Sequence, residues 1–362
     1  MRGKMLILAN SSSGLYSFRR ELIGEILAGN DVIASTPDRG NIWDLEAIGC
    51  NVLLTDIDRR GINPVTDLKL MLNYWKMLRR EKPDLVITYT IKPNVYGGMV
   101  CRLLGIPYAA NITGLGTAFQ KQGALRTLVT ILYKTALKKA KVIFFENAEN
   151  MQVLLDERIA RNAQCCLLNG AGVNTEYYAY TTYPEAEGTT RFLFVGRVMR
   201  EKGVDELFTA MSRLQENGFD CVLDVVGGFE ENYAEKIAAH TEQGWLRYHG
   251  YQKDVRPYIE KAHCLVLPSY HEGMANTNLE CAAMGRPVIT SNIHGCKEAV
   301  EDGVSGLLCE MQNTDSLYDA MVRFVKLSGE ERAAMGCVGR TRMEEIFDKK
   351  KVVAATLKAL GL

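Results

Sequence analysis

Two glutamates, Glu272 and Glu280, stand eight residues apart in the run HEGMANTNLECAAMGRPVI, residues 271–289. The preceding residues 263–270 (HCLVLPSY) have the pattern of a short buried strand that a proline ends. The residues after Asn276 carry apolar side chains at near-helical spacing. We therefore expect Glu272 in a strand-to-helix turn and Glu280 about one turn into the helix, both facing the crevice at the carboxyl end of a parallel sheet. Carboxylates in that place suit the hydroxyl groups of a sugar or a ribose.

A second stretch, FLFVGRVMREKG at residues 192–203, combines a strand, a glycine turn at Gly196 and two cations near a predicted helix start. The cations are Arg197 and Lys202. Backbone N–H groups and the helix dipole at such a start favour an anion that the side chains can clamp, so the pattern is typical of phosphate binding. Two solvated basic residues at an ordinary turn remain the alternative.

Two further strand ends carry glycine or tyrosine. The run DVVGG at residues 224–228 contains Gly227, which permits close backbone approach to a ligand, although such a glycine also occurs in simple tight turns. The run YHGYQ at residues 248–252 contains Tyr251 and could hold a flat base through backbone groups and a ring. A purely structural tyrosine is the alternative.

The composition is that of a soluble α/β protein. A length of 362 residues predicts two domains of roughly 180 residues each, and the chain is 47% hydrophobic and 24% charged. No apolar stretch reaches the roughly 18 residues that a membrane span needs. The beginning, MRGKMLILA, superficially resembles a signal peptide, but its apolar run is short and leads into a loop and a helix, so it predicts a core strand. Ten cysteines without CxxC or metal-ligand spacing predict reduced thiols in a cytoplasmic protein and no metal site.

The neutral net charge conceals an asymmetry between the two halves. Residues 1–180 contain 22 Lys and Arg against 16 Asp and Glu, whereas the remainder contains 21 against 27. A basic first half suggests that one face meets an anionic partner. No helix-turn-helix pattern or aromatic–basic interleaving is present, so nucleic acid is not the expected partner.

Strands and helices alternate in both halves, which predicts parallel sheets covered on both faces by helices. The strands expected in the first half are 5–10, 31–35, 51–55, 85–89, 107–111 and 142–146, and those in the second are 192–195, 221–226, 246–249, 264–268, 288–290 and 306–308. The helices expected in the first half are 16–28, 43–48, 64–80, 95–104, 124–139 and 149–157. We predict domains at residues 1–180 and 181–345, joined through the polar stretch 181–190, with a final amphipathic helix within residues 346–362 that packs back on the first domain.

The motifs together resemble those of the family 4 retaining glycosyltransferases of the GT-B fold, over essentially the whole chain. The similarity is closest to bacterial enzymes that extend lipid-linked or capsular oligosaccharides, such as the N-acetylgalactosaminyltransferases acting on undecaprenyl-diphosphate sugars. The motifs that carry it are FVGR…EKG, VVGG, LPSYHEG with the glutamate pair, and GRPVI, supported by GLYSFR (14–19), GINP (61–64) and GLG (114–116).

This resemblance implies a role for each site residue. Arg197 and Lys202 would bind the donor diphosphate, Glu280 the ribose hydroxyls, and Glu272 a hydroxyl of the transferred sugar while stabilising an oxocarbenium-like transition state. Arg197, Lys202 and Glu272 would be the catalytic residues. The other donor-binding residues implied are Gly14, in a glycine turn at residues 10–14 that would close over the diphosphate, and Gly196, Gly227, Tyr251, Gly273, Met274, Ala275 and Asn276. No cofactor and no metal would be needed, because two cations and helix ends neutralise the diphosphate.

The sequence departs from the family pattern in two places. Many relatives have proline where Ala275 stands, so this edge of the sugar pocket is expected to differ. Some relatives use a histidine of the first domain near the sugar, but all five histidines here lie after residue 239. This absence fits the retaining mechanism that the resemblance implies, in which the departing phosphate takes the acceptor proton and catalysis rests on positioning and charge stabilisation.

The basic first half contains two segments with apolar and cationic residues. One combines Leu70, Met71, Leu72, Trp75 and Met77 with Lys69, Lys76, Arg79, Arg80 and Lys82; the other combines Leu128, Val129, Ile131 and Leu132 with Arg126, Lys134, Lys138, Lys139 and Lys141. Such helices could rest on anionic lipid or grip a lipid diphosphate. Alternatively, their apolar faces belong to the core and their lysines are merely solvated.

Taken together, the sequence predicts a cytoplasmic enzyme, peripheral to the membrane, with its active site between two Rossmann-like domains. It would move a sugar from a UDP-sugar, the nucleotide-sugar donor, to a lipid-linked glycan acceptor, with retention of configuration, and domain closure would complete the site. Two alternatives are a UDP-sugar 2-epimerase with the same layout and a periplasmic-type sugar-binding protein without activity.

Overall fold

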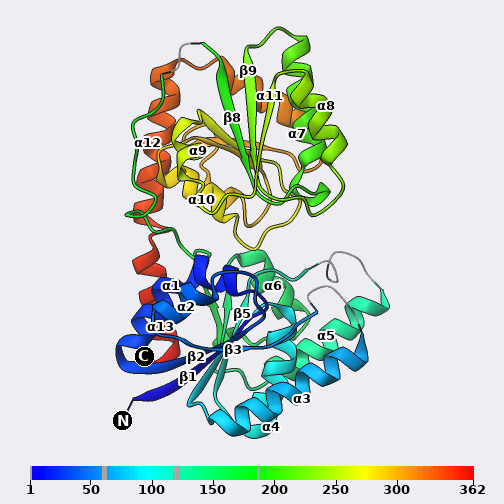
Figure 1. Ribbon diagram of the computed structural model, residues 1–362, viewed down its shortest axis with the longest axis vertical. Helices are drawn as coiled ribbons and strands as arrows, with labels where there is room; N and C mark the ends of the chain where they lie inside the picture. The colour runs from blue at the N-terminus through cyan, green and yellow to red at the C-terminus, as the bar shows by residue number, and fades with distance from the viewer. Residues whose placement is uncertain (1, 59–62, 117–118, 120–122, 186–187) are drawn as a thin grey trace. The chain divides into compact units, whose positions relative to one another are not determined.

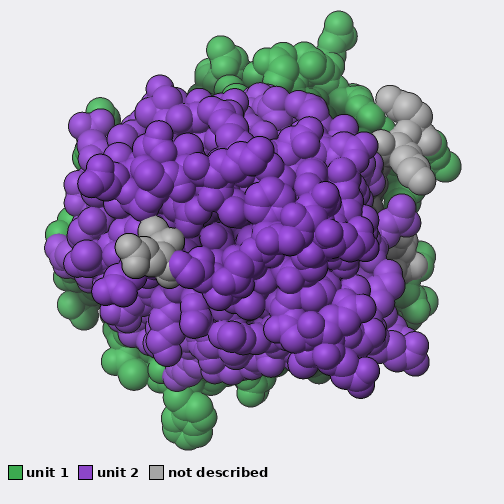
Figure 2. Space-filling model, turned by 90° about the horizontal axis from the view of Figure 1, so that it is seen from above, with its two compact units in different colours: residues 1–171, 350–362 green, residues 172–349 purple. Residues whose placement is uncertain are grey.

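The computed structural model describes residues 2–58, 63–116, 119, 123–185 and 188–362. Two motif residues, Gly61 and Ile62 of GINP, and two of the predicted linker, residues 186 and 187, therefore lie outside the described residues. The chain forms two compact units, which Figure 2 distinguishes by colour. Unit 1 comprises residues 1–171 and 350–362, and unit 2 comprises residues 172–349.

Unit 1 is built on a sheet in the order β3-β2-β1-β4-β5-β6-β7, in which every pair is parallel. Strands β1, β4, β5 and β6 are almost wholly buried, as a sheet covered on both faces requires. Their bounds are β1 Gly3–Leu8, β2 Asn30–Thr36, β3 Asn51–Leu54, β4 Leu85–Tyr89, β5 Tyr108–Ile112, β6 Val142–Phe145 and β7 Cys165–Leu167.

The helices of unit 1 cover this sheet (Figure 1). The final helix α13 belongs to the same unit from Lys350 onward, and its Val352, Val353 and Leu360 share a buried cluster with Met5 and Ile7 of β1. The bounds are α1 Ser12–Gly29, α2 Ile42–Ala47, α3 Pro64–Glu81, the π-helix η1 Pro93–Gly97, α4 Gly98–Leu104, α5 Ala124–Leu137, α6 Ala148–Asp156, the 3-10 turn η3 Asn162–Gln164 and α13 Lys349–Leu360.

Unit 2 repeats the architecture with a parallel sheet in the order β10-β9-β8-β11-β12-β13. Its strands are β8 Thr190–Val195, β9 Cys221–Val226, β10 Leu246–Gly250, β11 Cys264–Leu267, β12 Val288–Ser291 and β13 Gly306–Cys309. Its helices are η4 Arg200–Lys202, α7 Val204–Glu216, α8 Ala234–Glu242, α9 Arg256–Lys261, α10 Asn276–Ala283, η5 Lys297–Ala299, α11 Thr314–Val325 and α12 Gly329–Glu345.

The fold class is confirmed, and every predicted strand is present, with shifts of two residues or fewer at its ends. One strand was not predicted: β7, three residues at the edge of the first sheet, is too short for an alternating pattern to show. Helix 95–104 is also more complex than predicted, because its first part is the π-helix η1.

Among the residues that the structure describes, no helix is both long and apolar enough to cross a membrane. The same part of the chain contains no group of three or more His, Cys, Asp or Glu side chains arranged to hold a metal ion.

Candidate functional site

The predicted motifs lie beyond the carboxyl ends of β8 and β11, which pair in the sheet of unit 2, the place where open α/β sheets form a ligand crevice. From β8 the chain first adds β9 and β10 on one side of the sheet and later β11, β12 and β13 on the other. In an open parallel sheet the place where strand order reverses is where ligands bind. Gly196 and Arg197 follow β8, and residues 268–273, which contain Glu272, follow β11. The structure therefore brings the two predicted motifs together at one switch point.

Lys202 and Glu272 form an ion pair in this crevice, with Lys202 Nζ donating to Glu272 Oε1. Their side chains are only 17% and 12% exposed. The loops that carry them are fastened together, because Tyr270 N donates to Glu201 O at 2.9 Å. Gly203 next to Lys202 has φ +71°, and a Cβ there would lie 2.1 Å from Pro268 O. Only glycine allows this approach, so Gly203 is part of what places Lys202 beside Glu272.

Arg197, the other predicted phosphate ligand, lies 3.4 Å from Glu230 Oε2 and is 42% exposed. The sequence does not predict this pairing of Arg197 with Glu230. Nothing in the residue pattern distinguishes Glu230 from the adjacent Glu231, which instead accepts a hydrogen bond from Arg200 N at 2.8 Å.

Gly196 and Gly227 let the ends of β8 and β9 approach closely. Gly227 has φ +148°, and a Cβ there would lie 1.8 Å from Gly196 O. Gly196 N donates to Val226 O at 3.0 Å, and Gly227 N donates to Gly250 O at 2.8 Å, so three strand ends are joined here. The glycines thus serve backbone packing at the rim of the crevice, whether or not a ligand also uses the space.

Aromatic side chains line the end of β10. The hydroxyl of Tyr248 donates to Gly227 O at 2.9 Å, and its ring stacks on Phe229 with centroids 4.8 Å apart. Tyr248 is thus a structural tyrosine, and Phe229 is a neighbour that the sequence reasoning missed. Tyr251, the residue predicted to meet a base, is 72% exposed.

Residues 273–276 lead into α10. Met274 and Ala275 are buried, and Ala275 N donates to Gly295 O at 2.7 Å. Gly295 has φ +88°, and a Cβ there would lie 2.6 Å from Glu272 O, so this glycine also holds the loop in place. The cap residue Ala275 makes no side-chain hydrogen bond to α10. The first turn of α10 therefore begins without a side-chain cap, although Asn278 N donates to Ala275 O at 2.9 Å; an uncapped helix start is compatible with an anion site.

Glu280 lies one turn into α10 and is partly buried. Burial raises the pKa of its carboxyl to about 7, although a hydrogen bond from Tyr178 and the charge of Lys349 both act to lower it. Neither Tyr178 nor Lys349 was identified from the sequence, because both are distant from Glu280 along the chain and no motif marks them.

Gly14 is the one predicted donor-binding residue in unit 1. It does not lie in a glycine turn as expected: α1 begins at Ser12, and Gly14 is in its first turn. Ser11 caps this helix by accepting a hydrogen bond from Gly14 N at 3.1 Å. A favourable cap starts a helix even where a glycine follows, which is why the predicted turn is helical.

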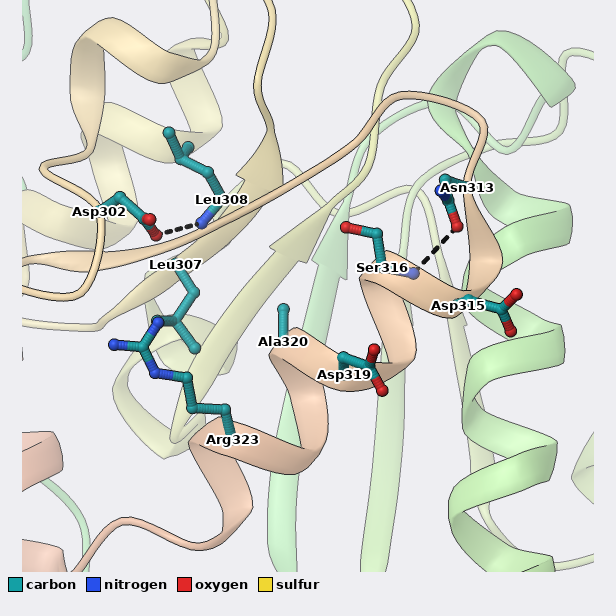
Figure 3. A pocket seen from close by; sticks show the side chains of 9 residues that line it. All are labelled: Asp302, Leu307, Leu308, Asn313, Asp315, Ser316, Asp319, Ala320 and Arg323. Carbon is teal, nitrogen blue, oxygen red and sulfur yellow. Dashed lines mark hydrogen bonds between the residues drawn. The ribbon is translucent and has the colours of Figure 1, made fainter.

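A cavity of about 470 Å³ lies elsewhere in unit 2, between β13 and α11 (Figure 3). Asp302 Oδ1 accepts from Leu308 N at 2.9 Å, and Asn313 Oδ1 accepts from Ser316 N at 3.0 Å. These contacts cover an edge strand and cap a helix. None of the predicted site residues lines this cavity.

Comparison with known proteins gives two family matches. The family described as "Glycosyl transferase 4-like" matches residues 4–147, and "Glycosyl transferases group 1" matches residues 189–326. Among curated relatives, the N,N'-diacetylbacillosaminyl-diphospho-undecaprenol alpha-1,3-N-acetylgalactosaminyltransferase of Campylobacter jejuni is 26% identical over 86% of each chain. The UDP-Gal:alpha-D-GlcNAc-diphosphoundecaprenol alpha-1,3-galactosyltransferase of Escherichia coli is 28% identical over 73% of this chain and 72% of its own.

Solved structures show the same fold. The crystal structure of Anabaena Alr3699/HepE in complex with UDP and glucose has a TM-score of 0.83, with 14% identity over 99% of this chain and all of that one. WaaG, a glycosyltransferase involved in lipopolysaccharide biosynthesis, has a TM-score of 0.74 with 15% identity. Together, the two family matches span most of the chain and the architecture is GT-B throughout. The chain therefore belongs to the family 4 (group 1) glycosyltransferases and is a hexosyltransferase-type enzyme.

Proposed function

We propose that this enzyme transfers an N-acetylhexosamine or hexose from a UDP-sugar to an undecaprenyl-diphosphate-linked glycan, with retention of configuration, in capsule, exopolysaccharide or other glycan biosynthesis. The observation that supports the proposal is the ion pair of Lys202 with Glu272 beyond the ends of β8 and β11, with Glu280 in α10, the helix that follows. The names of two curated relatives support the acceptor class, because both act on undecaprenyl-diphosphate-linked sugars.

Each site group has a part in donor binding under this proposal. Glu280 accepts hydrogen bonds from the ribose hydroxyls, and exposed Tyr251 meets the base. The first-turn amides of α10, from Asn276, face the diphosphate and sugar. Glu272 binds a hydroxyl of the transferred sugar, and Gly14 lies on the unit 1 helix expected to close over the diphosphate.

The reaction breaks the bond between the anomeric carbon and the diphosphate oxygen and forms a bond from that carbon to the acceptor oxygen. The departing diphosphate gains negative charge, which Lys202 and Arg197 stabilise electrostatically. The acceptor proton passes to the departing phosphate. Glu272 stabilises the positive charge that develops on the sugar ring, and the ion pair with Lys202 fixes its carboxylate in place.

A lipid-linked acceptor requires the enzyme to work at a membrane surface, and two helices of unit 1 expose apolar side chains suited to that. Leu72 of α3 and Leu128 and Ile131 of α5 are each about half exposed, at 51%, 48% and 56%. Leu128 and Ile131 are followed in the same segment by the exposed lysines Lys134, Lys138 and Lys139. We infer that α3 and α5 contact an anionic lipid surface, since apolar side chains flanked by lysines favour it.

The proposal is tested by measuring nucleotide release from a panel of UDP- and GDP-sugars, with and without a synthetic undecaprenyl-diphosphate-linked acceptor. We expect UDP release from one UDP-sugar only when acceptor is present, together with an α-linked product. Conversion of one UDP-sugar into another without acceptor would favour the epimerase alternative. GDP release would contradict the donor class.

A further inference from the structure

The sheet of unit 2 does not by itself fix the two loops that carry the ion pair of Lys202 with Glu272. In the ladder between β8 and β11, the last pair of residues is Leu193 with Leu265. Each strand continues past that pair to its own carboxyl end, and the loops begin only there. Other contacts must therefore set the spacing between the lysine and the glutamate.

Tyr270 ties the loop after β11 to the chain on both sides of Lys202. Its backbone N donates to Glu201 O at 2.9 Å, and Glu201 directly precedes Lys202. Its hydroxyl donates to Glu206 Oε1 at 2.7 Å, and Glu206 follows Lys202 in the first turn of α7. Tyr270 is only 6% exposed. Because the two hydrogen bonds flank Lys202 along the chain, they hold the two loops together at two points.

Glu206 belongs to a helix that is anchored in the core. Val204, Leu207 and Phe208 of the same turn are members of the buried hydrophobic cluster of unit 2. A side chain on a packed helix holds its partner in a better-defined position than a side chain on a loop does. The hydroxyl of Tyr270 is therefore fastened to the core, in addition to the bond that its backbone makes to the neighbouring loop.

The hydrogen bond from Tyr270 also satisfies a partly buried carboxyl group. Among the residues that the structure describes, the other carboxyl oxygen of Glu206, Oε2, is buried and has no hydrogen-bond partner. Removing the tyrosine hydroxyl would therefore take from this carboxyl group the donor that it has, and a buried polar group without a partner is costly. Opening of this bond is unfavourable for the same reason.

A second tyrosine binds the same turn of α7 from a different segment. The hydroxyl of Tyr233 donates to Asp205 Oδ2 at 2.8 Å, and Tyr233 is 5% exposed. Tyr233 lies between β9 and α8, whereas Tyr270 lies in the loop that carries Glu272. The two tyrosine–carboxyl pairs match in chemistry and burial, but of the two it is the Tyr270 pair that joins the Glu272 loop to α7.

We propose that Tyr270 and Glu206 are positioning residues for sugar transfer, whose hydrogen bond keeps Glu272 at a fixed spacing from Lys202. The proposal rests on the proposed function, in which Lys202 stabilises the departing diphosphate and Glu272 stabilises the sugar ring. The two charges develop together in one transition state, so both groups must already stand in place. A misplacement of about 1 Å can lower a rate about 100-fold.

The test is the steady-state rate of transfer with the UDP-sugar and the undecaprenyl-diphosphate-linked acceptor that the nucleotide-release panel identifies. Tyr270→Phe should lower kcat about tenfold, since it loosens the spacing but removes neither charged group. The KM for the donor should change less than about twofold, because the charges to be stabilised grow in the transition state. No change of kcat in Tyr270→Phe would overturn the inference.

Tyr233→Phe is the matched control. It removes an equivalent hydrogen bond from α7 without releasing the loop that carries Glu272, so kcat should stay within about twofold of the wild type. An equal loss of kcat in Tyr233→Phe and Tyr270→Phe would mean that any weakening of α7 slows the reaction, and would overturn the positioning role.

Two comparisons separate positioning from a purely structural role. In the Lys202→Met background, Tyr270→Phe should lower kcat by less than about a further twofold, because one member of the spaced pair is already gone. Glu206→Gln should keep nearly the wild-type kcat, since its amide oxygen still accepts from the hydroxyl, whereas Glu206→Leu should lose as much as Tyr270→Phe. A further loss of about tenfold in the Lys202→Met background, or equal rates in the two Glu206 variants, would contradict positioning.

The double variant Tyr270→Phe/Glu206→Leu guards against loss of folding. Replacing both partners leaves no unpaired carboxyl group, so the free energy of unfolding should stay close to that of the wild type while kcat is again about tenfold lower. A wild-type kcat in this variant would overturn the inference. If Lys202→Met itself keeps the wild-type kcat, the proposed function fails; a low kcat in Lys202→Met with an unchanged one in Tyr270→Phe defeats the positioning role alone.

Discussion

Glu272 and Glu280 are close in sequence, but the two carboxylates lie in different surroundings. Glu272 is paired with Lys202, while burial raises the pKa of Glu280 to about 7. A carboxylate held in place by an ion pair suits the stabilisation of a developing positive charge. The environment of Glu280 instead suits recognition of hydroxyl groups. We therefore expect only Glu272 to contribute to the choice of sugar.

The sequence predicted which residues gather at the crevice but not how they pair. The strand–turn–helix patterns around Lys202 and Glu272 are local, and parallel strands end at one edge, so their proximity follows from the fold class. The partners Glu230, Tyr178 and Lys349 are set by tertiary packing, which no local pattern encodes. Gly14 lies in a helix and not in the predicted turn, because the side chain of Ser11 caps α1 just before it.

Replacing Lys202 with methionine should lower kcat about 10²–10³-fold, because the departing diphosphate loses a fixed positive charge. Steady-state rates with saturating donor and acceptor measure this. Lys236→Met is the matched control, since Lys236 also forms an ion pair, with Asp205 at 2.6 Å, but is 59% exposed. An equal, small loss in both variants would mean that Lys202 serves structure alone.

At the scale of elements, the crevice depends on loops that approach more closely than a side chain permits. Gly203, Gly227 and Gly295 each have positive φ and a neighbouring carbonyl where Cβ would stand. The sequence predicts glycine turns at Gly196 and Gly227 where the backbone could come close to a ligand. In the structure, glycine is required at position 227 because its backbone packs directly against that of Gly196. This contact joins two separate segments, so the spacing of residues in the sequence does not indicate it.

We expect Gly203→Ala to lower the free energy of unfolding by about 3 kcal/mol, because it adds a clash with Pro268 O to an unfavourable φ. Gly218→Ala is the control, with φ +77° and open space around its Cβ, so it should cost only about 1 kcal/mol. Urea unfolding of both variants measures the difference. Equal losses would show that the Gly203 contact is not needed.

The α5 helix gives a prediction about membranes. Lys141 is not among the residues to be replaced, because its Nζ donates to Leu360 O at 2.6 Å and this hydrogen bond holds α13. Replacing exposed Lys134, Lys138 and Lys139 with glutamine should reduce co-sedimentation with phosphatidylglycerol vesicles. At low salt, each charge removed should weaken the free energy of vesicle binding by about 1 kcal/mol.

The control for this experiment replaces three exposed lysines of unit 2, Lys236, Lys261 and Lys326, and so removes the same total charge. Its vesicle binding should remain close to that of the wild type. Equal reduction in both triple variants would show that net charge, rather than the α5 surface, governs sedimentation.

At the scale of the whole molecule, alternating strand and helix patterns were sufficient to predict two parallel sheets. The buried strands are continuous apolar runs, such as VIFF in β6 and CLVL in β11, which a covered parallel sheet requires. β7 was not predicted, because Cys165–Leu167 is short and lies at the edge of the sheet. Such a strand is defined by its hydrogen-bonded pairing with β6 and not by an alternating sequence pattern. The excess of positive charge in the first half of the chain agrees with the proposal that this half contacts the lipid and the acceptor diphosphate.

The central claim is that Glu280 binds the nucleotide and Glu272 binds the transferred sugar. One paired measurement tests this claim most directly. UDP affinity and transfer rate are determined at alkaline pH for Glu280→Gln and Glu272→Gln. We predict that Glu280→Gln weakens UDP binding about 10- to 100-fold, since hydrogen bonds to a charged group are lost. Glu272→Gln should bind UDP like the wild type while kcat falls about 100-fold or more. UDP affinity lost in Glu272→Gln and kept in Glu280→Gln would contradict the assignment.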